Sequence, residues 1–160
     1  MIFGKSLSDY VSFEKGFLIL VVVVGLARLA LSLLGVPNST AKFVSLTVLL
    51  LLGMVYYSVR VHTSGFGSYK HLLPVLALPV IVANCIIVGG IILAMLTGKD
   101  NIYSAPEFSG GVDGKTWGHV GGHVLVTVVG PFIFWLVGSL VMFVTKKVTG
   151  SRAQTVGTGT

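Results

Sequence analysis

Four long apolar runs, separated by polar segments, restrict the folds open to this chain. The runs cover about residues 16–35, 42–61, 72–97 and 119–145. Each is near or above the roughly 20 residues that an α-helix needs to cross about 30 Å of hydrocarbon. We therefore predict an all-α, multi-pass integral membrane protein with a four-helix bundle, a polar N-terminal segment over 1–15 and a mobile tail over 146–160.

The scarcity of charge supports this prediction. Only 10% of the 160 residues are charged and the mean hydropathy is +0.94, whereas soluble domains carry about 25% charged residues. The net charge of +6 would suggest a nucleic-acid partner in a soluble protein. Here the basic residues flank apolar runs, where they act as topology signals and contact anionic headgroups. We expect the lipid bilayer, and no nucleic acid, as a partner.

The basic residues are unequally divided between the two predicted sides. The side of the termini holds Lys5, Lys15, Arg60, Lys70, Lys146, Lys147 and Arg152, and the other side holds Lys42, Lys99 and Lys115. Because basic residues accumulate on the cytoplasmic side, this distribution predicts that both termini are cytoplasmic. The membrane would then be a plasma or inner membrane, and the segment of about 20 residues between the third and fourth helices would face outward.

That outer segment is rich in aromatic side chains and glycine. Tyr103, Phe108 and Trp117 provide apolar anchors, and several glycines allow sharp turns. We expect the segment to fold back over the mouth of the bundle or to dock on a partner. The alternative is a solvated loop without fixed structure.

His119 and His123 are the candidate metal ligands. Their spacing of four residues places them on one face of the last helix, and histidines at this spacing can hold one metal ion. Asp100, Glu107 or Asp113 would add an oxygen ligand, because zinc accepts mixed ligand sets. The alternative is that both imidazoles hydrogen-bond the outer segment.

A b-type haem requires two axial ligands at a common depth. His62 and His71 belong to the side of the termini, whereas His119 and His123 belong to the other side. Two arrangements stay open: His62 with His71 across their short connection, or His123 with its copy in a dimer.

Arg28 is the most costly residue in the predicted spans, since placing a charge near the middle of a helix costs at least about 2.5 kcal/mol. None of the four runs contains an acidic residue that would pair with it. Arg28 would therefore extend toward the interface, share hydrogen bonds with Ser32 or Asn84, or meet an anionic lipid, a ligand or a carboxylate of another subunit. Gly25, Arg28 and Ser32 share one helix face, which we name the polar seam. Asn84 would form an interhelical hydrogen bond.

Small residues mark places where helices can approach closely. Gly118 and Gly122 form a small-xxx-small pair, and Gly53, Gly89 and Gly90 add further positions. Such residues favour tight helix packing, either within one chain or between chains.

No catalytic signature is present: the sequence has no Walker loop, dinucleotide fingerprint or nucleophile elbow, and Cys85 is its single cysteine. We expect a non-catalytic subunit of a larger membrane complex that serves electron transfer or transport. Its outer segment and polar seam, with Asn84, Tyr103, Phe108 and Trp117, would bind other subunits, a second copy or lipid. One alternative is a metal- or haem-binding redox protein using His119 and His123. Another is a small anion channel or carrier lined by Arg28 and Asn84.

Overall fold

The computed structural model describes the backbone of residues 1–157 and the side chains of residues 1–149. Within them the fold is all-α. The helices are α1 (Leu7–Leu33), α2 (Asn38–Ala41), α3 (Leu46–Thr63), α4 (Tyr69–Thr97) and α5 (Trp117–Gly157), with a 3₁₀ turn at Pro106–Phe108. Four segments are long and apolar enough to cross a membrane, and one of them contains both α2 and α3. The predicted four-helix bundle of a membrane protein is therefore confirmed.

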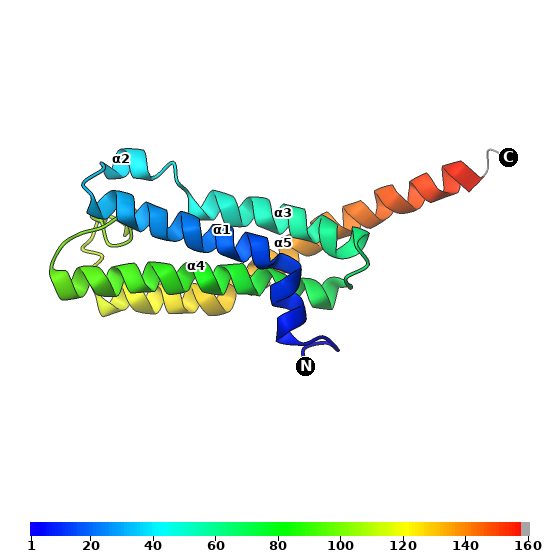
Figure 1. The fold of residues 1–160 in the computed structure, drawn as a ribbon, viewed down its shortest axis with the longest axis horizontal. Coiled ribbons are helices and arrows are strands. Elements are labelled where there is room, and N and C mark those ends of the chain that lie inside the picture. The colour runs from blue at the N-terminus through cyan, green and yellow to red at the C-terminus, as the bar shows by residue number, and fades with distance from the viewer. Residues whose placement is uncertain (158–160) are drawn as a thin grey trace.

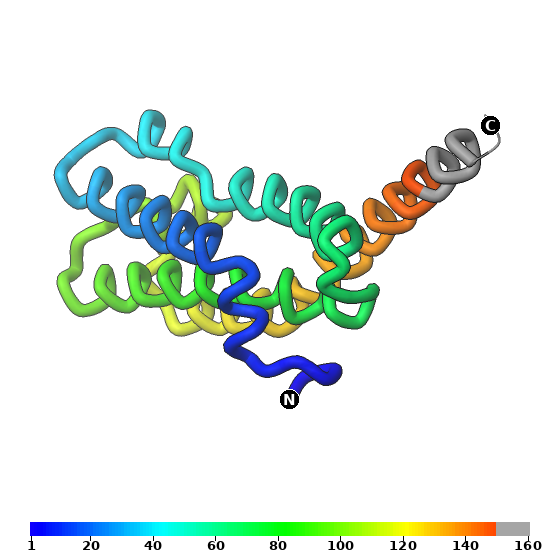
Figure 2. Tube along the Cα trace, turned by 45° about the vertical axis from the view of Figure 1, so that its right-hand side comes forward, coloured from blue at the N-terminus to red at the C-terminus, as the bar shows by residue number. Residues whose placement is uncertain are grey.

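The four long helices run antiparallel to their neighbours along the chain (Figure 1). The N-terminus and the projecting part of α5 consequently lie toward the same end of the bundle, where α3 connects to α4 (Figures 1 and 2). We call this the terminal end. The opposite end carries α2 and the 98–116 segment, and we call it the loop end. The compartment that each end faces stays a prediction from the basic residues.

Two helices extend further than the apolar runs suggest. Helix α1 begins at Leu7, where Ser6 and Asp9 form a reciprocal capping box: each backbone N–H bonds the other's side chain. Glu14 is thus inside the first spanning helix and not in a separate N-terminal segment. Helix α5 continues to Gly157. Residues 158–160 of the expected mobile tail lie outside the described residues, and its mobility stays a prediction.

The core consists of two clusters, one toward each end. The terminal cluster contains Tyr10, Met54, Tyr57, Val61, Leu72, Val75, Leu76 and Met142. The loop cluster contains Val21, Ala41, Leu46, Ala83, Ile91, Ile102, Tyr103 and Val120. Each cluster draws side chains from at least three segments of the chain, so both help to hold the helices in register.

Glycines permit the closest contacts between helices. The Phe17 ring of α1 fills the space that a side chain at Gly53 of α3 would occupy. A Cβ atom at Gly138 of α5 would lie 2.6 Å from the Ser58 hydroxyl oxygen. In contrast, Gly122 has no side chain or other helix within 4 Å of its Cβ position. Of the small residues predicted to mediate packing, Gly53 contacts another helix of the same chain, whereas Gly122 has no such contact.

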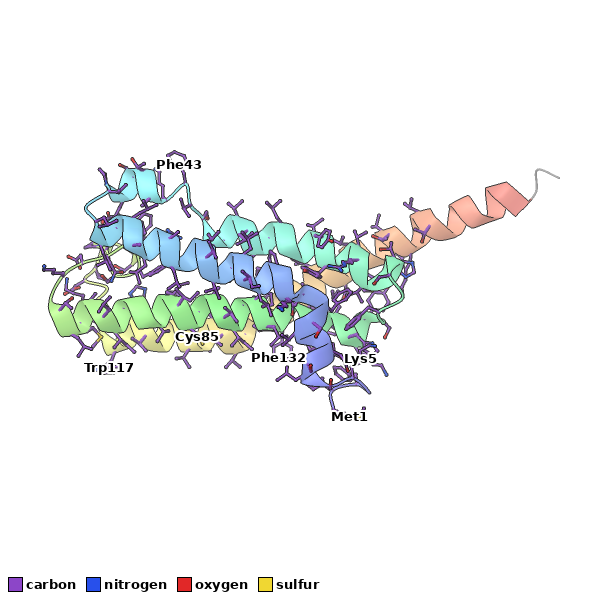
Figure 3. All side chains as sticks on the ribbon, in the orientation of Figure 1. Met1, Lys5, Phe43, Cys85, Trp117 and Phe132 are labelled. Atoms are coloured by element: carbon purple, nitrogen blue, oxygen red, sulfur yellow. The ribbon has the colours of Figure 1, made fainter. Side chains whose placement is uncertain are left out.

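Large apolar side chains cover the outside of the bundle. Trp117, Phe132 and Cys85 project away from their helices, and Phe43 projects from the turn between α2 and α3 (Figure 3). Phe43 is 82% and Trp117 71% exposed. Because a hydrocarbon solvent accepts such side chains, this surface fits a bundle surrounded by lipid.

Candidate functional site

The 98–116 segment folds back onto the bundle. Asn101 anchors it by donating from Nδ2 to the Gly90 carbonyl oxygen at 2.7 Å, and Tyr103 donates its hydroxyl to the Gly25 carbonyl oxygen at 2.8 Å. Gly90 makes room for the Tyr103 ring, which would lie 2.6 Å from a Cβ atom there. The segment therefore covers the loop end of its own chain, the first of the two arrangements expected from its aromatic residues.

Tyr103 is the buried centre of this contact. Its side chain is only 5% exposed. Burial raises the pKa of Tyr103 to about 12, although the nearby Arg28 charge acts in the opposite direction. The phenol is therefore a neutral hydrogen-bond donor throughout the physiological range.

The acidic side chains of the segment lie at its surface. Lys115 bonds Asp100 at 2.6 Å and Asp113 at 3.2 Å, and these contacts, the Asp100 hydrogen bond first, raise the pKa of Lys115. Glu107 accepts a 2.8 Å hydrogen bond from Asn38 Nδ2, which lowers the pKa of Glu107. The three carboxylates expected to add an oxygen ligand to a metal are thus engaged in other contacts.

Arg28 lies beneath the folded segment. Its guanidinium carbon is 5.6 Å from the Tyr103 ring centroid and 5.7 Å from that of Phe108, both within the range of cation–π attraction. The Nε atom of Arg28 is buried and has no hydrogen-bond partner among the described residues. Ser32 bonds Asn38 instead. The guanidinium therefore has aromatic neighbours, and its Nε lacks a hydrogen-bond partner among the described residues.

The two histidines of α5 lie side by side, as their spacing predicts, with ring centroids 5.1 Å apart. Nδ1 of His119 is 3.0 Å from the Gly114 carbonyl oxygen, which can only accept, so this nitrogen carries the proton. Nδ1 of His123 is 3.0 Å from Oδ1 of Asn84, whose Nδ2 donates to the Val80 carbonyl. His123 therefore also donates from Nδ1, and Asn84 forms the interhelical bond expected of it. Both rings keep Nε2 available to a ligand.

These side chains surround one pocket of about 230 Å³, which we call the loop-end pocket. Its lining residues are Arg28, Leu46, Thr47, Ile87, Ile102, Tyr103, Phe108, His119 and His123. The polar part of this lining consists of a guanidinium, two imidazoles, a phenol and a hydroxyl. The pocket contains no carboxylate, so its electrostatic character favours an anion.

Metal or haem would find a limited ligand set. Among the described side chains, no group of three His, Cys, Asp or Glu residues is placed to hold a metal ion. His71 uses both ring nitrogens, on Ser68 and on the Phe3 carbonyl, and His62 contacts Thr149. A haem between His62 and His71 would have to replace these contacts. A metal ion at His119 and His123 would have two imidazole ligands from the described residues and no third.

Most of the predicted site residues meet in one place. The loop-end pocket is lined by Arg28, Tyr103, Phe108, His119 and His123. Asn84 accepts a hydrogen bond from Nδ1 of His123. Trp117 does not take part, because it projects outward.

One buried ionisable residue escaped the sequence analysis. Glu14 is completely buried in α1. The signal for it was its spacing: Tyr10, Glu14, Phe17, Val21, Gly25 and Arg28 follow one another at intervals of three or four residues. We call this row the inner stripe of α1. Glu14 therefore occupies the same face as Arg28.

No protein-family model matches the chain, and neither a curated protein nor a solved structure shows significant similarity to it.

Proposed function

We propose that this membrane protein binds a small anionic group, a carboxylate or a phosphate, in the loop-end pocket. The observation that carries the proposal is Arg28, a half-buried cation whose Nε has no partner and whose pocket lacks a carboxylate. A guanidinium presents its donors as a planar fork that matches carboxylate and phosphate oxygens. An anion in the pocket would supply the partner that the described side chains do not.

The remaining lining supports the same ligand. His119 and His123 present Nε2, which becomes a donor when the ring is protonated, and Thr47 adds a hydroxyl. Phe108 is 40% exposed and lies over the guanidinium, so it covers the charged group without closing the pocket.

The test measures thermal unfolding of the detergent-purified protein in inorganic phosphate or acetate, against chloride at equal ionic strength. A ligand at 100 times its dissociation constant stabilises a folded protein by about 2.7 kcal/mol, so the unfolding midpoint should rise. Arg28→Gln should abolish this rise. Lys99→Gln, which removes an exposed cation from the same end, should preserve it.

Nanodiscs distinguish a lipid headgroup from a free anion. Greater stabilisation of the wild type by phosphatidylglycerol than by phosphatidylcholine, lost in Arg28→Gln, would identify a lipid ligand. Anion flux into liposomes that depends on Arg28 would instead identify a carrier or channel. If the wild type and Arg28→Gln respond equally to both anions and to both lipids, the proposal is wrong.

A second candidate is a subunit that assembles with another copy or another membrane protein. It is favoured by Gly121 and Gly122 of α5, whose Cβ positions have no neighbour within 4 Å. A second helix can approach closely along such a surface. Gly122→Leu should then convert an oligomer in native mass spectrometry to a monomer. The matched change Leu136→Val, on an exposed position of the same helix, should leave the oligomer intact. A wild type that is monomeric and that co-purifies with no other protein from its native membrane would contradict this candidate.

A further inference from the structure

Glu14 is the one acidic side chain in the described part of the chain that is fully buried. None of its surface is exposed, and neither carboxyl oxygen has a hydrogen-bond partner among the described residues. Between described side chains, ion pairs join Lys115 to Asp100 and to Asp113, and Glu14 takes part in none. An ionised carboxylate with no partner costs several kcal/mol even after relaxation of its surroundings. The structure thus contains an acid in a place that penalises its charge.

Among the described residues, no cation forms an ion pair with Glu14. On α1 itself, Tyr10 lies one turn away and donates its hydroxyl to the Ile2 carbonyl oxygen. On α3, Tyr57 lies within electrostatic range of Glu14. Arg60 is the nearby cation of α3, but its guanidinium carbon stacks 4.7 Å from the Phe13 ring centroid and 5.8 Å from that of Tyr57.

The other two helices contribute apolar side chains to this core. Leu72, Val75 and Leu76 of α4 and Met142 of α5 belong to the terminal cluster, together with Tyr10 and Tyr57. Two described lysines stack on rings at the edge of this cluster: Lys5 Nζ lies 4.5 Å from the Phe66 ring centroid and Lys146 Nζ 4.1 Å from that of Tyr69. Neither forms an ion pair with Glu14, whose carboxyl group has no exposed surface.

We propose that Glu14 is a proton-binding site, which holds a proton on its carboxyl group at neutral pH. The side chain has no exposed surface, so any ligand larger than a proton would require the core to open. A neutral carboxylic acid fits the enclosed position, because it carries no net charge. Release of the proton requires the Glu14 end of α1 to separate from α3 or α4, so protonation is linked to the packing of this helix.

Isotope-edited infrared spectroscopy tests the proposal with few signals, because Glu14 and Glu107 are the only two glutamates of the chain. The protein is made by cell-free synthesis with glutamate carrying ¹³C in the side-chain carboxyl group, and compared with unlabelled protein at pH 7. The labelled carboxyl groups should give two signals: a carboxylate band from the exposed Glu107 and a protonated C=O band from Glu14. In D₂O the frequency of the protonated C=O band should shift slowly, because the buried Glu14 proton exchanges slowly for deuterium.

Two variants assign the bands. Glu107→Gln should remove the carboxylate band and keep the protonated one, and Glu14→Gln should do the reverse. If Glu14→Gln fails to fold, Glu107→Gln decides alone, because Glu14 is then the single remaining glutamate. A carboxylate band and no protonated band in Glu107→Gln would overturn the proposal. This outcome is independent of the loop-end pocket, since neither glutamate lines it.

Discussion

Arg28 and Glu14 lie on the same face of α1, about 21 Å apart along the helix, but their surroundings at the two ends of the bundle differ. Arg28 borders a pocket with imidazole, phenol and hydroxyl groups. Glu14 is enclosed among aromatic and aliphatic side chains. At the loop end a polar ligand can therefore replace existing contacts, whereas at the terminal end it would first have to break the core.

The two ends also differ in what holds them together. The loop end depends on single hydrogen bonds from a segment between helices, such as Asn101 to Gly90 and Tyr103 to Gly25. The terminal end depends on rings: Phe13 stacks on Phe66 with centroids 3.9 Å apart. We expect damage at the loop end to stay local and damage at the terminal end to affect the whole bundle.

The largest effect should follow from Gly53→Leu, in the middle of α3, where Phe17 packs between α3 and the terminal cluster. The new side chain competes with the Phe17 ring for the same space, and overpacking of this kind costs about 1–3 kcal/mol. Unfolding in mixed micelles with increasing sodium dodecyl sulfate measures the loss. Gly89→Leu is the matched control, because nothing lies within 4 Å of that Cβ position. Equal losses in the two variants would contradict the packing described for Gly53.

Gly90→Leu should have a smaller and more local effect. Its side chain displaces the Tyr103 ring, which detaches the 98–116 segment while the four helices stay packed. Trypsin should then cleave after Lys99 and Lys115 much faster than in the wild type, with little change in the helical circular dichroism. Global unfolding of Gly90→Leu would show that both ends respond alike and would remove the distinction between them.

Tyr103→Phe removes one hydrogen bond and should cost about 1 kcal/mol. The same variant also tests how docking of the 98–116 segment depends on pH. Because the pKa of Tyr103 is raised to about 12 in the folded protein from 10, its protonated form stabilises segment docking fully below pH 10. This stabilisation is lost as the pH rises from 10 to 12. Proteolysis of the 98–116 segment should increase over that interval in the wild type, and increase less in Tyr103→Phe. An identical pH profile would contradict the burial of the phenol.

Lys115→Met should have the smallest effect. The ion pairs of Lys115 lie at the surface, where pairing in high dielectric contributes little. We expect an unchanged unfolding midpoint and unchanged proteolysis of the segment. A marked increase in cleavage would mean that the surface charges, and not Tyr103 and Asn101, hold the loop end.

The sequence is sufficient to predict the bundle, because hydrocarbon imposes the length and composition of each spanning helix. It also indicates that Tyr103 and Phe108 anchor the outer segment, since aromatic side chains in a long loop need a surface to cover. The contact between Asn84 and His123 was beyond prediction. These residues are 39 positions apart, and the rotation of α4 against α5 decides whether they face each other. Apolar faces toward lipid and toward protein have the same composition, so the sequence does not specify that rotation.

Glu14 was missed for a different reason. Hydropathy locates the centre of a spanning helix and not its ends, so the charged residues before Gly16 appeared to belong to a separate segment. The capping box at Ser6 and Asp9 starts the helix earlier. Once the helix begins at Leu7, the spacing from Tyr10 through Glu14 to Phe17 places the carboxyl group on the inner stripe.

Helix α5 is much longer than its neighbours, with 41 residues against 18 in α3. At 1.5 Å per residue it measures about 62 Å, roughly twice the hydrocarbon thickness. Its final turns extend past the rest of the bundle (Figure 1). The hydrocarbon layer covers only about half of this length, so the rest of α5 has to lie outside it. The projecting turns therefore carry the chain away from the bundle at the terminal end.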